Sequence, residues 1–167
     1  GWKNVGYSLG FPEECTCIAE LEGQDRIEQA CIKIGASEVG QGVNTILAQI
    51  AAETLGIPYD AVLMHELDTT IVPNAGSASA SRHSFMSGNA VKAACELALQ
   101  AWKAGQRPAV VTHTYKGPKT TPFDPVTGEC DPNFSYGYAS QVANVEVDME
   151  TGEVALTRVI AAHDTGK

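Results

Sequence analysis

The sequence contains no hydrophobic run of the roughly 20 residues that a membrane-spanning helix needs, so we expect no membrane insertion. Basic residues are also scarce, because 11 Lys and Arg stand against 20 Asp and Glu, for a net charge of −9. A chain this acidic repels nucleic acid and anionic membrane surfaces, so we expect neither as a partner. The N-terminal residues show no apolar core followed by a small-residue cleavage site, and we expect a cytoplasmic protein.

Metal-binding patterns are lacking as well. The five cysteines have no zinc-site spacing, and none of the four histidines lies at the spacing of a metal-binding helix. Cys15 and Cys17 alternate along an expected strand, which places both thiols on one face, and we expect reduced and mostly buried cysteines. What is present is a globular composition, with 44% hydrophobic and 19% charged residues among 167, and we expect a single domain over 1–167.

Hydrophobic periodicity predicts the order of elements. Residues alternate between apolar and polar at 14–21 and 26–34, as in a β-hairpin, and apolar residues recur at helical spacing at 44–55 and 84–104. Asn44 is the expected N-cap of the first helix. Further strands are expected at 61–67, 108–115, 137–147 and 153–162. The order ββαβαβ plus a C-terminal hairpin predicts an α+β fold, a two-layer mixed β-sheet with two helices on one face.

Glycines surround the first candidate site. Gly40 and Gly42 flank Gln41 directly before the first helix, where they leave backbone amides uncovered and let a ligand approach closely. The helix N-terminus behind them adds partial positive charge, and the Gln41 side chain can both donate to and accept from a polar heterocycle. The same spacing also fits a glycine-rich turn that only leads the chain into a helix, so both interpretations stay open.

Small and hydroxyl-bearing residues precede the second helix at 76–84, with Arg82 at its start. Hydroxyls, exposed amides, a helix N-terminus and a guanidinium suit a phosphate, although a flexible loop with a solvated arginine has the same composition. Between residues 69 and 123 six basic residues stand against one acid, Glu96, which favours the anion site. Because both loops precede helices on one face of one expected sheet, a single elongated ligand can touch both.

At these loops the sequence resembles the molybdenum hydroxylases, the family of xanthine dehydrogenase and aldehyde oxidase. The resemblance runs over nearly the whole chain from Glu14 on. Two of its motifs are bounded by glycines and resemble two motifs of the family's large subunit in their order along the chain and in their separation. The matching segments are 38–45, 49–58, 73–82, 88–91, 136–139 and 147–166. The resemblance implies a fold of the molybdenum-cofactor-binding type, and a fragment from the C-terminal part of the molybdopterin-binding region of a longer large subunit.

The ligand that the resemblance implies is molybdopterin, or its cytosine dinucleotide as in many bacterial members. By position, the residues that would contact the pterin are Gly40, Gln41 and Gly42. The residues that would hold the pyrophosphate or the pterin edge are Ser79, Ala80, Ser81, Arg82 and His83. In many relatives Gln or Thr stands where this chain has His83 and Ser84.

The implied activity is hydroxylation of an aldehyde or an N-heterocycle with water as the oxygen source. The expected partners are the remainder of the molybdenum subunit and the iron–sulfur and FAD subunits, so that Fe–S clusters and FAD lie only on other domains or subunits. The family's catalytic glutamate belongs to a G-x-G-E pattern that this chain lacks, so we expect no catalytic residue here and no activity of the chain alone. Two alternatives stay open: a free-standing module that binds a pterin or nucleotide, and a subunit-interaction domain without activity.

Overall fold

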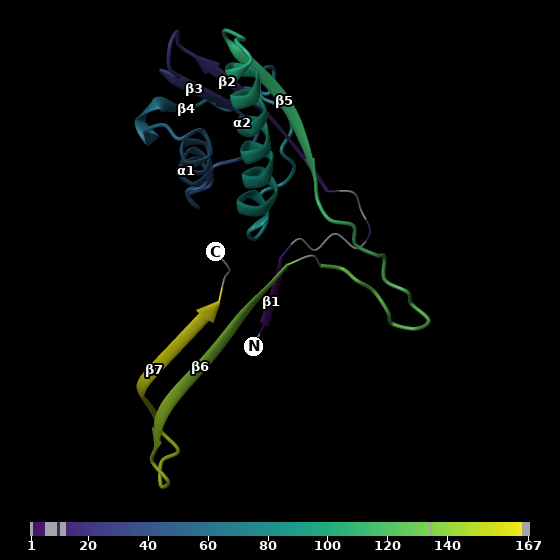
Figure 1. Ribbon diagram of the computed structural model, residues 1–167. Helices are drawn as coiled ribbons and strands as arrows, with labels where there is room; N and C mark the ends of the chain where they lie inside the picture. The colour runs from purple at the N-terminus through teal and green to yellow at the C-terminus, as the bar shows by residue number, and fades with distance from the viewer. Residues whose placement is uncertain (1, 6–9, 11–12, 134, 165–167) are drawn as a thin grey trace.

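The computed structural model describes residues 1–167 except 1, 6–9, 11–12, 134 and 165–167. Its strands are β1 (Trp2–Val5), β2 (Glu14–Glu22), β3 (Gln29–Lys33), β4 (Val62–Met64), β5 (Ala109–Lys116), β6 (Ser135–Val147) and β7 (Val154–Asp164). Its α-helices are α1 (Val43–Leu55) and α2 (Gly88–Lys103), with a 3-10 turn at Tyr59–Ala61 and a π-helical turn at His83–Ser87 that runs into α2. The described strands form two β-sheets (Figure 1).

The larger sheet has the strand order β4-β3-β2-β5. β2 pairs antiparallel with both β3 and β5, whereas β4 joins β3 in parallel. In the β2–β5 register Glu14 lies opposite Lys116, and Leu21 lies opposite Ala109. Both α-helices lie side by side over one face of this mixed sheet (Figure 1). The two-layer α+β architecture predicted from the sequence is therefore confirmed.

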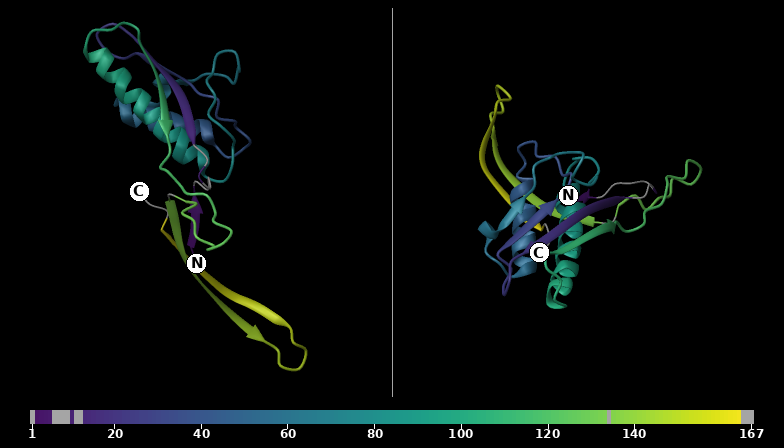
Figure 2. Two further views of the ribbon diagram at one scale, coloured as in Figure 1. Left: turned by 90° about the vertical axis from the view of Figure 1, so that its right-hand side faces the viewer. Right: turned by 90° about the horizontal axis from the view of Figure 1, so that it is seen from above.

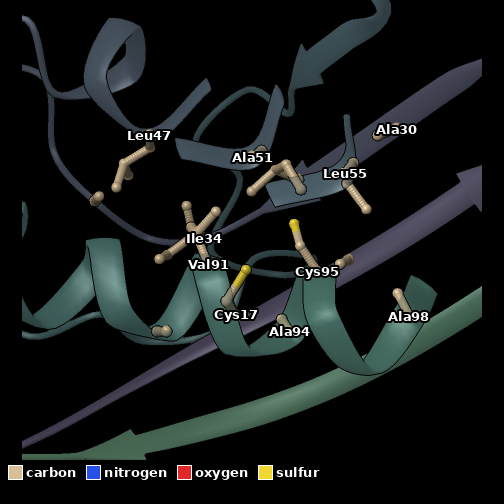
Figure 3. Packing of buried hydrophobic residues seen from close by; sticks show 14 of the residues in the cluster. Cys17, Ala30, Ile34, Leu47, Ala51, Leu55, Val91, Ala94, Cys95 and Ala98 are labelled. Atoms are coloured by element: carbon tan, nitrogen blue, oxygen red, sulfur yellow. The ribbon is translucent and has the colours of Figure 1, made fainter. Parts of the chain in front are cut away.

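The core lies between this sheet and its helices. Alternate residues of β2 point inward and are fully buried, while the residues between them are half-buried. The inward residues are Cys15, Cys17, Ala19 and Leu21. The α2 residues that pack against them are mostly small: Ala90, Val91, Ala94, Cys95 and Ala98. Figure 3 shows the α2 residues Val91, Ala94, Cys95 and Ala98 close to Cys17 of the sheet and to Leu47, Ala51 and Leu55 of α1. The predicted burial of Cys15 and Cys17 is confirmed.

The starts of the two helices differ from the prediction. The N-cap of α1 is Gly42 rather than Asn44, because glycine readily adopts the left-handed φ of 78° found there, and Asn44 lies inside the helix. The expected helix from residue 84 begins as the π-helical turn, and α2 follows from Gly88. At Gly88 the helices approach closely, since a Cβ built there would lie 3.0 Å from Cδ1 of Ile50 in α1.

The second sheet has the order β1-β6-β7. The predicted C-terminal hairpin is confirmed as β6 and β7, which pair antiparallel with a register shift between Asn144 and Val145. Strand β1, which pairs with β6, has no counterpart in the prediction. The hairpin extends away from the helix-covered sheet (Figures 1 and 2). Its large apolar side chains are exposed: Val142, Val145, Val147, Val154, Leu156, Val159 and Ile160.

Candidate functional site

The two loops predicted to form the site lie at one edge of the helix-covered sheet. β3, β4 and β5 run in the same direction, because β4 is parallel to β3 and both β3 and β5 are antiparallel to β2. α1 links β3 to β4 and α2 links β4 to β5, so both helices start at the carboxyl edge of these strands. We call residues 37–42 the α1 loop and residues 73–82 the α2 loop. The Gly35 amide, just before the α1 loop, donates to the Pro73 carbonyl at 2.9 Å, which joins the two segments.

Glu38 closes the α1 loop. Its Oε1 accepts the backbone N–H groups of Gly40 at 2.9 Å and Gly42 at 3.0 Å, and its Oε2 accepts that of Asn44 at 3.2 Å. Hydrogen bonds from these amides, that of Gly42 foremost, hold the pKa of Glu38 below its ordinary value. The start of α1 therefore holds a carboxylate where the sequence predicted uncovered amides.

The Gln41 side chain also forms hydrogen bonds within the α1 loop. It accepts the Val39 amide at 2.7 Å and donates to the Ser37 carbonyl at 2.9 Å. Gly40 and Gly42 have positive φ angles of 95° and 78°, and no atom lies within 4 Å of a Cβ built on either. The loop is thus fixed by its own hydrogen bonds and presents bare backbone to open space.

Arg82 organises the α2 loop. Its Nη2 lies 2.7 Å from Oε2 of Glu13 and donates to the Glu14 carbonyl at 3.1 Å, and its Nη1 donates to the Ala75 carbonyl at 2.5 Å. Gly76 lies directly against the guanidinium, whose Cζ would be 2.7 Å from a Cβ built on that glycine. Arg82 is only 9% exposed. Its charge is therefore paired with Glu13 and with loop carbonyls, so Arg82 is not the solvated arginine that the sequence left open.

His83 is buried at the start of the π-helical turn. Its Nδ1 lies 2.8 Å from Oγ of Ser87, which in turn lies 3.4 Å from Sγ of Cys15 in β2. Its Nε2 is also buried and has no hydrogen-bond partner among the described residues. Burial, and then the charge of Arg82, lower the pKa of His83, so the ring is neutral at pH 7. A π-helical turn and the left-handed φ of 43° at Ala80 are features that cluster at ligand-binding segments.

Two adjoining hollows lie beside the α2 loop. The first, of about 460 Å³, is lined by Glu13, Glu14, Gly76, Ser77 and Arg82. The second, of about 350 Å³, shares Glu13 and Glu14 with it and continues along residues 116–120. The two glutamates neutralise part of the basic excess of this region, because Glu13 pairs with Arg82 and Glu14 lies 3.3 Å from Lys116. The α2 loop also carries three serines, Ser77, Ser79 and Ser81, and all three are exposed.

Comparison with known proteins connects this geometry to a family. A family model described as the molybdopterin cofactor-binding domain matches residues 2–106 and 96–167. The chain belongs to this family. The aldehyde oxidoreductase of Megalodesulfovibrio gigas is 28% identical over 187 aligned positions, which cover 98% of this chain and 20% of that protein. A xanthine dehydrogenase of Oryza sativa subsp. japonica is 30% identical over 152 positions, which cover 79% of this chain and 11% of the enzyme.

The solved structures show the same relationship. The aldehyde oxidoreductase from Desulfovibrio gigas matches with a TM-score of 0.81 and 27% identity, over 98% of this chain and 19% of that one. The molybdopterin cofactor-binding domain seen here thus spans about a fifth of the length of these relatives, or less. The family resemblance and the fold type inferred from the sequence are both confirmed.

The molybdopterin cofactor-binding domain carries all eight predicted site residues on the two neighbouring loops or at the start of the π-helical turn. Their direct contact with a cofactor remains a prediction. The first candidate motif spans 38–42, but the sequence analysis assigned no role to Glu38 and did not consider Glu13. A glutamate two residues before a glycine at a helix start is the pattern that could have indicated the role of Glu38. No local pattern indicates the role of Glu13, because only the fold brings it to Arg82. In the described part of the chain no group of three or more His, Cys, Asp or Glu residues could hold a metal ion, and no helix is long and apolar enough to span a bilayer.

Proposed function

We propose that this chain forms one wall of the cofactor cradle in a molybdenum hydroxylase, an oxidoreductase that hydroxylates an aldehyde or an N-heterocycle with water as the oxygen source. The observation that carries the proposal is the meeting of two helix-initiating loops at one sheet edge, in a chain of the molybdopterin cofactor-binding domain family. Relatives named aldehyde oxidoreductase and xanthine dehydrogenase support the reaction class.

The residues at this edge fit a pterin cofactor. Open space beside Gly40 and Gly42 lets a planar ring lie against bare backbone, which a Cβ at either position would obstruct. The exposed serines of the α2 loop and the start of the π-helical turn suit a phosphate group. We therefore assign the pterin to Gly40, Gln41 and Gly42, and the phosphate end to Ser79, Ala80, Ser81, Arg82 and His83. When bound, the cofactor supplies the metal centre at which hydroxylation and electron uptake take place.

The side chains of this site act mainly by shaping the two loops. Gln41 fixes the backbone of the α1 loop through Ser37 and Val39, so that loop needs no ordering when the ring binds. Arg82 does the same for the α2 loop through the Ala75 carbonyl and Glu13. His83 stays neutral and is held at Nδ1 by Ser87, which fixes the orientation of its ring.

The form of the cofactor and the partners extend this proposal. Two loops on one edge suit an elongated ligand, which favours the cytosine dinucleotide form of molybdopterin. Electrons then leave through Fe–S clusters and FAD on other domains or subunits in the cytoplasm, and the remainder of the molybdenum subunit supplies the substrate pocket and the catalytic glutamate.

The β6–β7 hairpin supports an incomplete cradle. Val145 pairs with Leu156 and Val147 with Val154 on one face of the hairpin, yet each of these side chains is about half exposed or more, at 49–62%. Apolar faces of this kind mark contact surfaces. The same observation favours a second candidate function, a subunit-interaction domain without activity of its own.

Cofactor loading tests the proposal. The chain is coexpressed with the remaining part of the enzyme, and molybdenum and pterin are measured per purified complex for the wild type, Gln41→Ala, Ser81→Ala and Gln49→Ala. Gln49 is a matched control, because it is an exposed glutamine on α1 that lines a separate hollow. We expect Gln41→Ala and Ser81→Ala to lower the cofactor content and Gln49→Ala to leave it unchanged. Equal loading in all four proteins contradicts the proposal.

A further inference from the structure

The starts of the two helices differ in charge. The α1 loop holds the Glu38 carboxylate within hydrogen-bond distance of three backbone amides. The carboxylates beside the α2 loop are each paired with a cation, because Glu13 lies 2.7 Å from Arg82 and Glu14 lies 3.3 Å from Lys116. Among the described residues Glu38 forms no such ion pair. The two ends of one elongated ligand therefore meet different electrostatic surroundings at this edge.

Glu38 occupies the position that an external anion would take. Backbone N–H groups that converge at a helix start ordinarily form a concave site for phosphate or carboxylate. The left-handed φ angles of Gly40 and Gly42 turn their amides toward Glu38, and both oxygens of its carboxylate accept hydrogen bonds there. A phosphate that approached this loop would find those donors in use and would face a like charge at short range.

Gln41 strengthens this arrangement from the other side of the loop. Its side chain is bonded to Val39 and Ser37, so it does not compete for the amides that Glu38 holds. The amides of Val39, Gly40 and Gly42 and the Ser37 carbonyl are thus paired within the loop, and the space beside Gly40 and Gly42 remains open. Such a surface accepts an uncharged planar group but not an anion.

We propose that Glu38 is a specificity-determining residue whose carboxylate excludes phosphate from the α1 loop and reserves that loop for the uncharged part of the ligand. The identity of that ligand rests on the proposed function above. The exclusion itself depends only on the carboxylate and the amides that it holds. With phosphate barred from the α1 loop, an elongated cofactor binds in one direction only, with its phosphate end toward the α2 loop.

Amide NMR with inorganic pyrophosphate tests this directly. The ¹⁵N-labelled 167-residue chain is titrated with pyrophosphate, and the Gly40, Gly42 and Asn44 amide signals are followed. In the wild type we expect no saturable shift of these signals. Glu38→Gln keeps the size of the side chain and removes its charge, so we expect saturable shifts of the same amide signals.

Glu53→Gln is the matched control, because it removes the same charge from an exposed position near the other end of α1. It must behave like the wild type. Glu38→Asp keeps the charge, so its loop signals must still show no saturable shift with pyrophosphate. If the loop signals of Glu38→Gln are lost, the result for Glu38→Asp decides whether the proposal stands. Saturable shifts in the wild type or in Glu38→Asp overturn the proposal, as does a folded Glu38→Gln loop without shifts. A chain that excludes pyrophosphate here but carries no pterin when coexpressed would refute the proposed function and leave this inference standing.

Discussion

Replacing Gly76 with alanine tests whether Arg82 holds the α2 loop together. Gly76 has a φ of 79°, a left-handed conformation that costs an L-residue about 1–2 kcal/mol. The new Cβ would also lie 2.7 Å from Cζ of Arg82, so the guanidinium must move away from Glu13 and from the Ala75 carbonyl. Breaking a buried ion pair costs about 3–5 kcal/mol, and we take about half of that because the Glu13 side chain is 22% exposed.

The sum of the two contributions predicts that Gly76→Ala lowers the free energy of unfolding by about 2.5–4.5 kcal/mol. Gly105→Ala is the control, since Gly105 has a φ of 92° and no atom lies within 4 Å of its built Cβ, so it bears only the backbone cost of about 1–2 kcal/mol. Urea unfolding followed by circular dichroism measures both variants, with equal slopes expected. If the two free energies agree within about 0.5 kcal/mol, Arg82 does not hold the loop in the way described.

Two further predictions concern buried side chains. In the native chain a thiol reagent should modify the exposed Cys130 rapidly and the half-buried Cys31 more slowly, and it should reach the other three cysteines only after unfolding; rapid modification of four or five thiols contradicts the core described here. Because burial lowers the pKa of His83 in the folded state, the unfolded chain binds its proton first as the pH falls below about 6.5, and stability is lost toward the folded pKa. His83→Gln should remove this component, so the difference in unfolding free energy between wild type and variant should decrease from pH 7 to pH 5, whereas a difference that does not change with pH refutes the assignment.

Hydrophobic periodicity was sufficient to predict the architecture of the helix-covered sheet. The alternation around Cys15 and Cys17 predicted the inward face of β2, because a strand with one buried face repeats every two residues. The predicted N-cap of α1 was wrong. Asn44 has good capping chemistry, but the left-handed backbone places the N-cap at Gly42, and the Glu38 carboxylate accepts the Asn44 amide. Strand β1 has only four residues, too few for a recognisable alternation, and it exists through pairing with β6.

The two loops were found from the sequence, but their charge was not. Counting residues between 69 and 123 gave a basic segment, which predicted an anion site. In the fold, the antiparallel pairing of β2 with β5 brings Glu14 opposite Lys116, and Glu13 reaches Arg82 from 69 residues away. A count along the chain cannot include such long-range pairs. The resulting site is more nearly neutral than the composition predicted.

The central claim is that both loops bind one ligand, and one titration tests it most directly. Molybdopterin cytosine dinucleotide is added to the ¹⁵N-labelled chain, and the Gly42 amide reports on the α1 loop while the Ser81 amide reports on the α2 loop. We predict that both signals shift with a single common midpoint, because one molecule contacts both loops at the shared sheet edge. A shift confined to one loop, or two separate midpoints, would contradict the claim.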